Sequence, residues 1–154
     1  MDVIKELNKT IEFIFDGDEK GYEENIFEHL KEICEGLGLP RIISASRQVQ
    51  IRFQGTQIIM DIVVRHEDES ATIFEVKKIN NKNPHTSTNE QVKAIGQMLL
   101  YKNIFEARTN AKTRVALITE KIYPRTMIVF SESKLPLTLI EFQKDKVFVP
   151  YKQF

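Results

Sequence analysis

Apolar residues recur at helical spacing in the first forty positions and predict two amphipathic helices. The predicted helices span residues 2–15 and about 22–35. Their apolar stripes are Ile4, Leu7, Ile11 and Ile14 in the first, and Ile26, Phe27, Leu30, Ile33 and Cys34 in the second. Asp16-Gly17-Asp18 separates the two helices, and the glycines and proline of residues 36–40 end the second one.

The pattern then changes from helical spacing to strands. Apolar and polar residues alternate over 48–53, and near-continuous apolar runs cover 58–64 and 72–77. Gln54-Gly55-Thr56 predicts a tight turn, and the polar residues 66–70 predict a second turn. Three strands joined by two short turns most simply form an antiparallel meander.

The second half of the chain alternates helix and strand. A polar loop is expected over residues 79–89, long enough to form a flap beside a site. A helix is predicted over about 90–107, and a strand over 115–119 that would return by a crossover connection. Residues 127–130 fit either a strand or the end of a helix, whereas 137–142 and 147–149 are typical of a closing hairpin. The 154 residues are near the usual length of one domain, so a single α/β domain over 1–154 is expected.

Composition limits the environment and the partners. The single cysteine, Cys34, cannot form an internal disulfide and is expected to be a buried structural thiol. The sequence also shows no signal peptide and no long apolar run. These features favour a soluble cytoplasmic protein with no membrane partner. The formal net charge is zero, but residues 1–40 carry a net charge of −7 and residues 41–154 a net charge of +7. This asymmetry is compatible with one basic surface that faces phosphates, and equally with solvated acidic helices.

Charged residues interrupt two strands that should be buried. Asp61 stands between Met60 and Ile62, and Glu75 stands between Phe74 and Val76. An ionised carboxylate in such surroundings costs several kcal/mol unless it is paired or binds a metal.

The spacing of these residues predicts one shared site. If the connecting turn is centred on Asp68, then Asp61 and Glu75 lie opposite each other on one sheet face, and Lys77 projects from that face too. A divalent cation such as Mg²⁺ (or Mn²⁺) would relieve the repulsion between the carboxylates, with the Val76 carbonyl as a further ligand. Such a metal beside an ammonium group suits phosphodiester hydrolysis, with Lys77 holding the attacking water or stabilising the transition state. The alternative is that Lys77 simply pairs with Glu75 or Asp61 on a solvated sheet face.

These residues also carry a family resemblance. Asp61, thirteen intervening residues and then Glu75-Val76-Lys77 resemble the signature of the PD-(D/E)XK nuclease superfamily, although Met60 replaces the proline of that name. The superfamily often places a glutamate on an early helix, and Glu23 fits, with Glu24 and Glu28 as close competitors.

A second motif extends the resemblance. Gln97-Met98-Leu99-Leu100-Tyr101 looks like the QxxxY motif on the helix after the catalytic strand, found in helicase-linked exonucleases, CRISPR-adaptation nucleases and the nuclease domains of type I restriction motor subunits. Lys93, Gln97 and Tyr101 form one ridge of that helix. The resemblance implies that Gln97 binds a water or the scissile phosphate and that Tyr101 contacts the substrate backbone, while Gly96 would let the helix approach closely. For an isolated Q-x-x-x-Y, an ordinary core tyrosine is the alternative.

The resemblance implies a restriction-endonuclease-like α/β core of order α-β-β-β-α-β. Its central mixed sheet would be flanked by helices, with an extra N-terminal helix and a C-terminal hairpin. The implied function is a Mg²⁺- or Mn²⁺-dependent nuclease, with catalytic residues Glu23, Asp61, Glu75, Lys77, Gln97 and Tyr101, and with DNA as the favoured substrate. The alternatives are a nuclease acting on RNA or gated by a partner or ligand, and a non-catalytic nucleic-acid-binding module on the same fold.

The small size makes a homodimer or a partner subunit plausible. His29, His66 and His85 lack the spacing of a zinc site.

Overall fold

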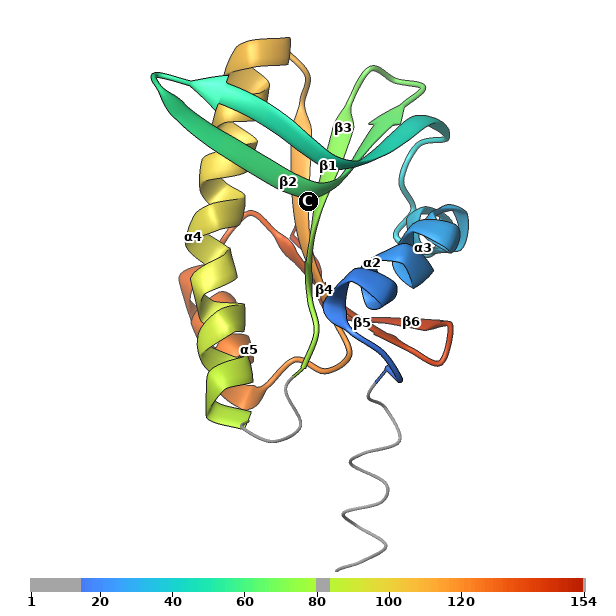
Figure 1. Cartoon of the computed structure of the whole chain (residues 1–154), viewed down its shortest axis with the longest axis vertical. Helices are drawn as coiled ribbons and strands as arrows, with labels where there is room; N and C mark the ends of the chain where they lie inside the picture. Colours follow the sequence, from blue (N-terminus) through green and yellow to red (C-terminus); the bar gives the residue numbers. More distant parts are fainter. Residues whose placement is uncertain (1–14, 80–83, 154) are drawn as a thin grey trace, which may run out of the picture.

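The computed structural model describes residues 15–79 and 84–153, with side chains from residue 87 onward in the second range. Its helices and strands are labelled in Figure 1. They are α2 (Glu19–Glu28), α3 (Leu30–Gly36), β1 (Ile42–Phe53), β2 (Thr56–His66), β3 (Ala71–Lys77), α4 (Pro84–Thr109), β4 (Thr113–Thr119), α5 (Pro124–Ser133), β5 (Thr138–Gln143) and β6 (Lys146–Tyr151). None of the helices in this part of the chain combines the length and the apolar character that crossing a membrane requires.

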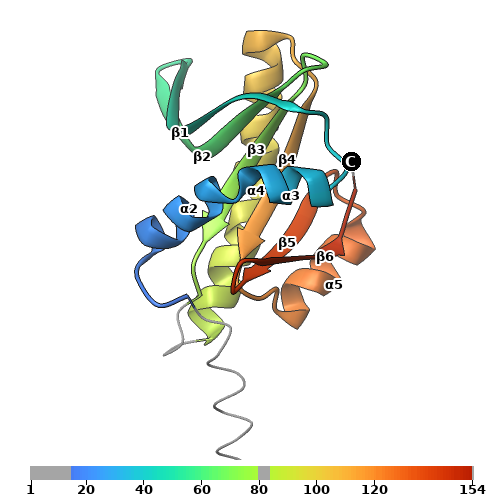
Figure 2. The same ribbon diagram turned by 90° about the vertical axis from the view of Figure 1, so that its right-hand side faces the viewer.

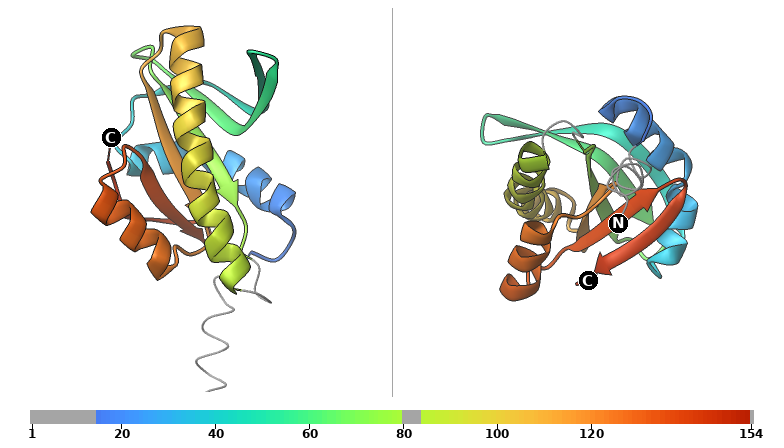
Figure 3. Two further views of the ribbon diagram at one scale, coloured as in Figure 1. Left: turned by 90° about the vertical axis from the view of Figure 1, so that its left-hand side faces the viewer. Right: turned by 90° about the horizontal axis from the view of Figure 1, so that it is seen from below.

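The strands form one mixed sheet in the order β1-β2-β3-β4-β5-β6. β1, β2 and β3 are antiparallel neighbours, as the meander prediction required, and β4 returns parallel to β3 after α4. One face packs against α4 and α5, and the other packs against α2 and α3; the two helical layers are seen on opposite sides of the sheet in Figures 2 and 3. The predicted α/β core with a central mixed sheet and flanking helices is therefore confirmed.

The first hairpin leaves the sheet as a long arm, which we define as residues 48–61 of β1 and β2. Its two-residue turn has positive φ at Gln54 and Gly55, the conformation that matches the right-handed twist of a hairpin. β2 pairs with β3 only from Ile62 to Arg65, so the arm continues beyond the edge of β3. Met60 packs with the α4 cluster and Ile62 with the α2 cluster, although residues two apart in a regular strand share a face. β2 therefore twists sharply at Asp61.

Several boundaries differ from the sequence prediction. The helix expected over 22–35 is two helices, because the backbone at His29 (φ −108°, ψ 14°) leaves the helical region. Residues 84–89 are helical, so the expected flap over 79–89 is wrong for that part, while residues 80–83 lie outside the described residues. The helix expected over 2–15 also lies outside them, apart from Phe15, which is not helical.

The C-terminal part extends the sheet. Residues 127–130 belong to α5, which settles the choice between strand and helix in favour of helix. The closing hairpin is confirmed: β5 and β6 are antiparallel, and β5 also pairs in parallel with β4. The buried hydroxyl of Tyr22 donates to the carbonyl of Phe142 (2.8 Å), which ties α2 to this hairpin.

Candidate active site

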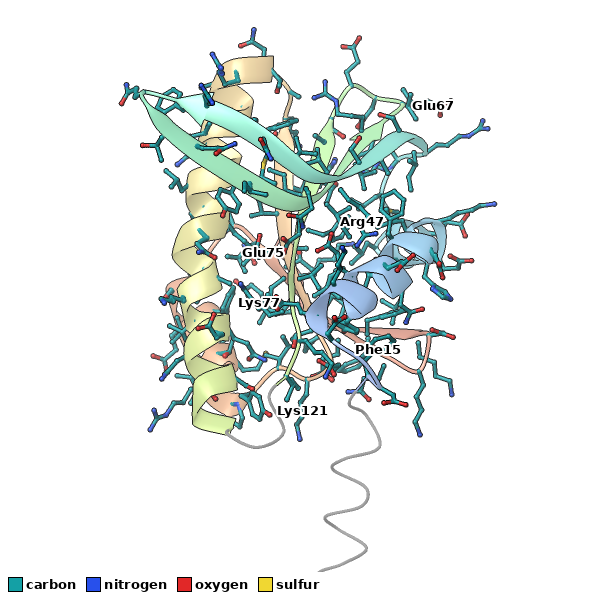
Figure 4. All side chains as sticks on the ribbon, viewed as in Figure 1. Phe15, Arg47, Glu67, Glu75, Lys77 and Lys121 are labelled. Atoms are coloured by element: carbon teal, nitrogen blue, oxygen red, sulfur yellow. The ribbon has the colours of Figure 1, made fainter. Side chains whose placement is uncertain are left out.

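The predicted register between the two charged strands is correct. Ile62 faces Phe74 in the antiparallel ladder, and continuing that register by one residue places Asp61 opposite Glu75. The backbone N–H of Val76 donates to Asp61 Oδ2 (2.8 Å), so the Asp61 carboxylate fills the gap where β2 turns away from β3. Figure 4 shows Glu75 and Lys77 on β3, between α4 and α2 and below the arm.

Glu75 is buried, at 4% exposure, and its Oε2 has no hydrogen-bond partner in the described structure. Its Oε1 lies 3.7 Å from Lys77 Nζ. Burial, and next the nearby Asp61 carboxylate, raise the pKa of Glu75 to about 8, although Lys77 acts in the opposite direction. Burial also raises the pKa of Asp61, against the lowering effect of the Val76 N–H. Two acidic groups therefore share a site that neither can occupy in ionised form without cost.

A glutamine links this pair to the early helix. Gln48 lies across the arm from Asp61, and its Nε2 donates to both Glu23 oxygens (3.2 and 3.0 Å) and, at 3.4 Å, to Asp61 Oδ1. Glu23 is buried at 5% exposure and also pairs with Arg47 Nε at 3.1 Å. The competing residues Glu24 and Glu28 are exposed. Of the three glutamates, Glu23 is the one that faces the site.

The candidate site residues on α4, the helix after β3, differ in their burial. Tyr101 is half-buried and packs against the α4 core cluster, and its pKa is raised by burial and by the nearby charges of Glu75 and Asp61. Gln97, one turn earlier, is exposed. The expectation for Gly96 is wrong: a Cβ there would meet no atom within 4 Å, so no close helix approach depends on this glycine.

Three residues that the sequence analysis did not assign border the site. Gln48 is one, and the second is Thr119, the β4 neighbour of Lys77, whose buried Oγ1 also has no hydrogen-bond partner in the part of the chain described. The third is Glu120, fully buried, which accepts the backbone N–H groups of Phe15 and Ile79 (2.7 Å each).

Glu120 also forms an ion pair with a neighbouring lysine. Lys78 Nζ lies 3.7 Å from Glu120 Oε2, and its side chain is only 15% exposed, so Lys78 does not face solvent. Glu120 thus anchors the end of β3 directly after Lys77. Long-range contacts of this kind leave no local signal in the sequence.

The donor set fits a small divalent cation with few protein ligands. The described residues contain no group of three or more His, Cys, Asp or Glu side chains placed to hold a metal ion. Two facing carboxylates remain, and they lie close enough for a protonated Glu75 to hydrogen-bond Asp61, while no N–H or hydroxyl group of the described residues donates to Glu75 Oε2. In an extended strand the C=O of a residue points to the same side as its N–H, so the Val76 carbonyl points to the β2 side of β3, on which Asp61 lies. Mg²⁺ is commonly held by one or two carboxylates plus waters, and these residues fit that pattern.

His66 and Cys34, the remaining residues considered in the sequence, lie away from the carboxylate pair in packed surroundings. The imidazole of His66 contacts the Pro40 carbonyl at 2.8 Å and Thr72 Oγ1 at 2.7 Å. Cys34 is buried, and burial raises the pKa of its thiol to about 12, which confirms the expected structural thiol.

Comparison with known proteins identifies the fold. No protein-family model and no curated protein matches the sequence. Among solved structures, a repair endonuclease from Pyrococcus abyssi matches 84% of this chain at 15% identity and a TM-score of 0.52. An FdxN element excision controlling factor protein from Anabaena variabilis matches 80% at 13% identity and a TM-score of 0.55. Can2 from Sulfobacillus thermosulfidooxidans, in complex with cyclic tetra-adenylate, matches 89% at 8% identity and a TM-score of 0.51.

The matched portions differ in extent. The chain covers 96% of the excision controlling factor but only 48% of the repair endonuclease and 41% of Can2. At sequence identities this low, the matches show a likeness of fold only. Two of the three matched proteins are about twice as long as this chain. The order of elements, the mixed sheet and these neighbours together show that the chain has a restriction-endonuclease-like fold.

Proposed function

We propose that this chain is a divalent-metal-dependent nuclease that hydrolyses phosphodiester bonds in DNA. The observation that carries the proposal is the buried carboxylate pair, Asp61 and Glu75, with Glu75 Oε2 lacking a partner and the Lys77 ammonium 3.7 Å from Glu75 Oε1. A purely structural ion pair would leave neither a second carboxylate beside the first nor an orphaned oxygen.

The proposed metal ligands are the carboxylates of Asp61 and Glu75 and the carbonyl of Val76. A Mg²⁺ or Mn²⁺ ion bound there would neutralise phosphate charge and lower the pKa of the attacking water. Lys77 would orient that water or stabilise charge that develops on the phosphate. Its ammonium remains beside the carboxylates because Thr119 and the anchored end of β3 flank it.

The other residues would position this core. Gln48 holds the carboxylates of Glu23 and Asp61 in one network, so Glu23 acts on the site through Gln48. Tyr101 lies near the carboxylates and would donate to a substrate phosphate, whereas Gln97 would meet the substrate from the exposed side of α4.

A cleavage assay tests this function directly. Purified protein would be incubated with Mn²⁺ or Mg²⁺ and with duplex DNA, single-stranded DNA and RNA in parallel. We expect cleavage of DNA that EDTA abolishes and that Glu75→Gln reduces at least about 100-fold. Glu67→Gln, which removes an exposed carboxylate from the β2–β3 turn, is the matched control and should cut like the wild type. Equal cleavage by the Glu75→Gln and wild-type proteins would refute the proposal.

The same assay separates the other readings. Cleavage of RNA alone would show that RNA, and not DNA, is the substrate. Activity that arises only with a second protein, or in dimeric fractions, would support the proposed dependence on a partner subunit. Metal-independent binding without any cleavage would indicate a non-catalytic module, which has no need for the buried carboxylate pair.

A further inference from the structure

The arm has two different faces. Alternate residues Val49, Ile51, Phe53, Ile58 and Met60 pack into the core cluster that includes α4. The residues between them, Gln48, Gln50, Arg52, Gln57 and Ile59, are exposed. We call these five residues the outer face of the arm; the next residue of this face, Asp61, belongs to the candidate active site.

Hydrogen-bonding groups dominate the outer face. Gln57 Nε2 donates to Gln50 Oε1 across the two strands (2.6 Å), and Arg52 lies opposite Gln57 in the ladder. Near the tip, Nη2 of Arg108 on α4 donates to the Arg52 carbonyl (2.9 Å), which brings a second guanidinium group close to the distal end of the arm. Three glutamine amides and the Arg52 guanidinium thus line the outer face as far as Asp61, and Arg108 of α4 lies beside its distal end.

The outer face of the arm carries one cation, Arg52, and no carboxylate before Asp61 at its base. Arg47, which directly precedes the arm, pairs with Glu23. The exposed carboxylates Glu24 and Glu28 lie instead on α2, on the other side of the site. A polyanion would therefore follow the arm and not α2.

We propose that the outer face of the arm binds the major groove of duplex DNA and delivers the adjoining phosphodiester to the candidate active site. This inference rests on the proposed nuclease function and specifies its substrate class. The major groove of B-form DNA, about 12 Å wide, admits a two-stranded ribbon, and glutamine and arginine pair with adenine and guanine edges there. The major groove of A-form RNA is too narrow for side chains to read.

The same face argues against single strands as the preferred substrate. Single-strand binding relies on aromatic side chains on which bases stack. The outer face contains no aromatic residue, and Phe53, the aromatic residue of the arm, packs inward on the α4 cluster.

Binding measurements test the inference independently of cleavage. Fluorescence anisotropy, in the Glu75→Gln background and without metal, would use a 20-base-pair DNA duplex, one of its single strands and an RNA duplex of the same sequence. The arm variant combines Gln50→Ala, Arg52→Ala and Gln57→Ala; the control is Lys146→Ala, an exposed cation on β6. We expect the arm variant to lose at least about tenfold in affinity for the DNA duplex and less than about twofold for the single strand. The control should lose less than about twofold for either.

Each result has a defined meaning. Unchanged duplex affinity in the arm variant, or equal losses on duplex, single strand and RNA, would overturn the inference. If the wild type cuts no nucleic acid but the arm variant selectively loses duplex binding, the nuclease proposal fails and the arm assignment stands. If the wild type cuts DNA and the arm variant binds duplex normally, only the arm assignment fails.

Discussion

Replacing Glu75 by glutamine should stabilise the metal-free protein at alkaline pH, although the change removes its ion pair with Lys77. Glu75 is buried, its Oε2 has no partner, and its pKa is raised from 4.5 to about 8. Between these two pH values the folded protein binds more protons than the unfolded chain does. The free energy of unfolding of the wild type therefore falls as the pH rises from about 4.5 to about 8, and levels off above that. Glutamine does not titrate and keeps the shape of the neutral acid.

The size of the effect follows from the same values. Raising a pKa from 4.5 to about 8 corresponds to about 5 kcal/mol at about 1.4 kcal/mol per pH unit. Water that enters when Glu75 ionises relieves part of this cost, so we expect the advantage of Glu75→Gln to grow by about 2 to 4 kcal/mol between pH 5 and pH 9.

Urea unfolding in EDTA at several pH values would measure this difference. Glu67→Gln, on the exposed turn, should show a pH-independent difference from the wild type close to zero. Mg²⁺ at ten times its dissociation constant should add about 1.4 kcal/mol to the wild type at pH 8 and much less to Glu75→Gln. A Glu75→Gln advantage that is the same at pH 5 and pH 9 would refute the argument that a buried, repelled carboxylate lies here.

Three further changes address the neighbours of the pair. Lys77→Met should reduce DNA cleavage at least about 100-fold with an unchanged circular dichroism spectrum, whereas Lys146→Met should not; activity within threefold of the wild type in Lys77→Met would contradict the assigned role. Thr119→Val removes a buried hydroxyl without a partner, so it should raise the free energy of unfolding by about 1 kcal/mol; a loss of stability in urea would show that the hydroxyl is satisfied. Glu120→Ala deprives two backbone N–H groups and the Lys78 ammonium of their acceptor and should cost about 3 kcal/mol in the same measurement, which an unchanged urea midpoint would contradict.

The carboxylate pair could be located from the sequence because its geometry is local. Asp61 and Glu75 lie on consecutive strands joined by a short turn, and counting outward from Asp68 fixes their register. The turn itself is stabilised by its own residues: Asp68 Oδ1 accepts the Ser70 N–H at 3.0 Å. Helical periodicity favoured Glu23, which shares the buried face with Ile26 and Leu30, but left Glu24 and Glu28 as competitors until the fold showed that both are exposed.

The parts that the sequence did not predict depend on contacts between distant segments. Gln48 is an ordinary polar residue of an alternating strand until the arm brings it between Glu23 and Asp61. Glu120 sits at the end of a predicted strand, and only the packed fold places it against backbone groups 105 and 41 residues away in the sequence. The N-terminal extension of α4 likewise depends on tertiary contacts: buried Gln91 bonds the Lys121 carbonyl and Thr126 Oγ1, which fixes that end of the helix against the β4–α5 connection.

The position of the site follows from the twist of β2. A carboxylate inside a regular sheet would oppose a neighbouring strand and find its backbone groups already paired. At Asp61 the ladder between β2 and β3 has ended, so the Val76 N–H is available to the Asp61 carboxylate, and the side chain of Glu75 meets it in the opening. The same departure of β2 from β3 sends the arm outward beside α4. One irregularity in a strand therefore creates both the opening that accommodates two acids and the projecting ribbon beside it, which is why a substrate held by the arm would lie next to the carboxylates.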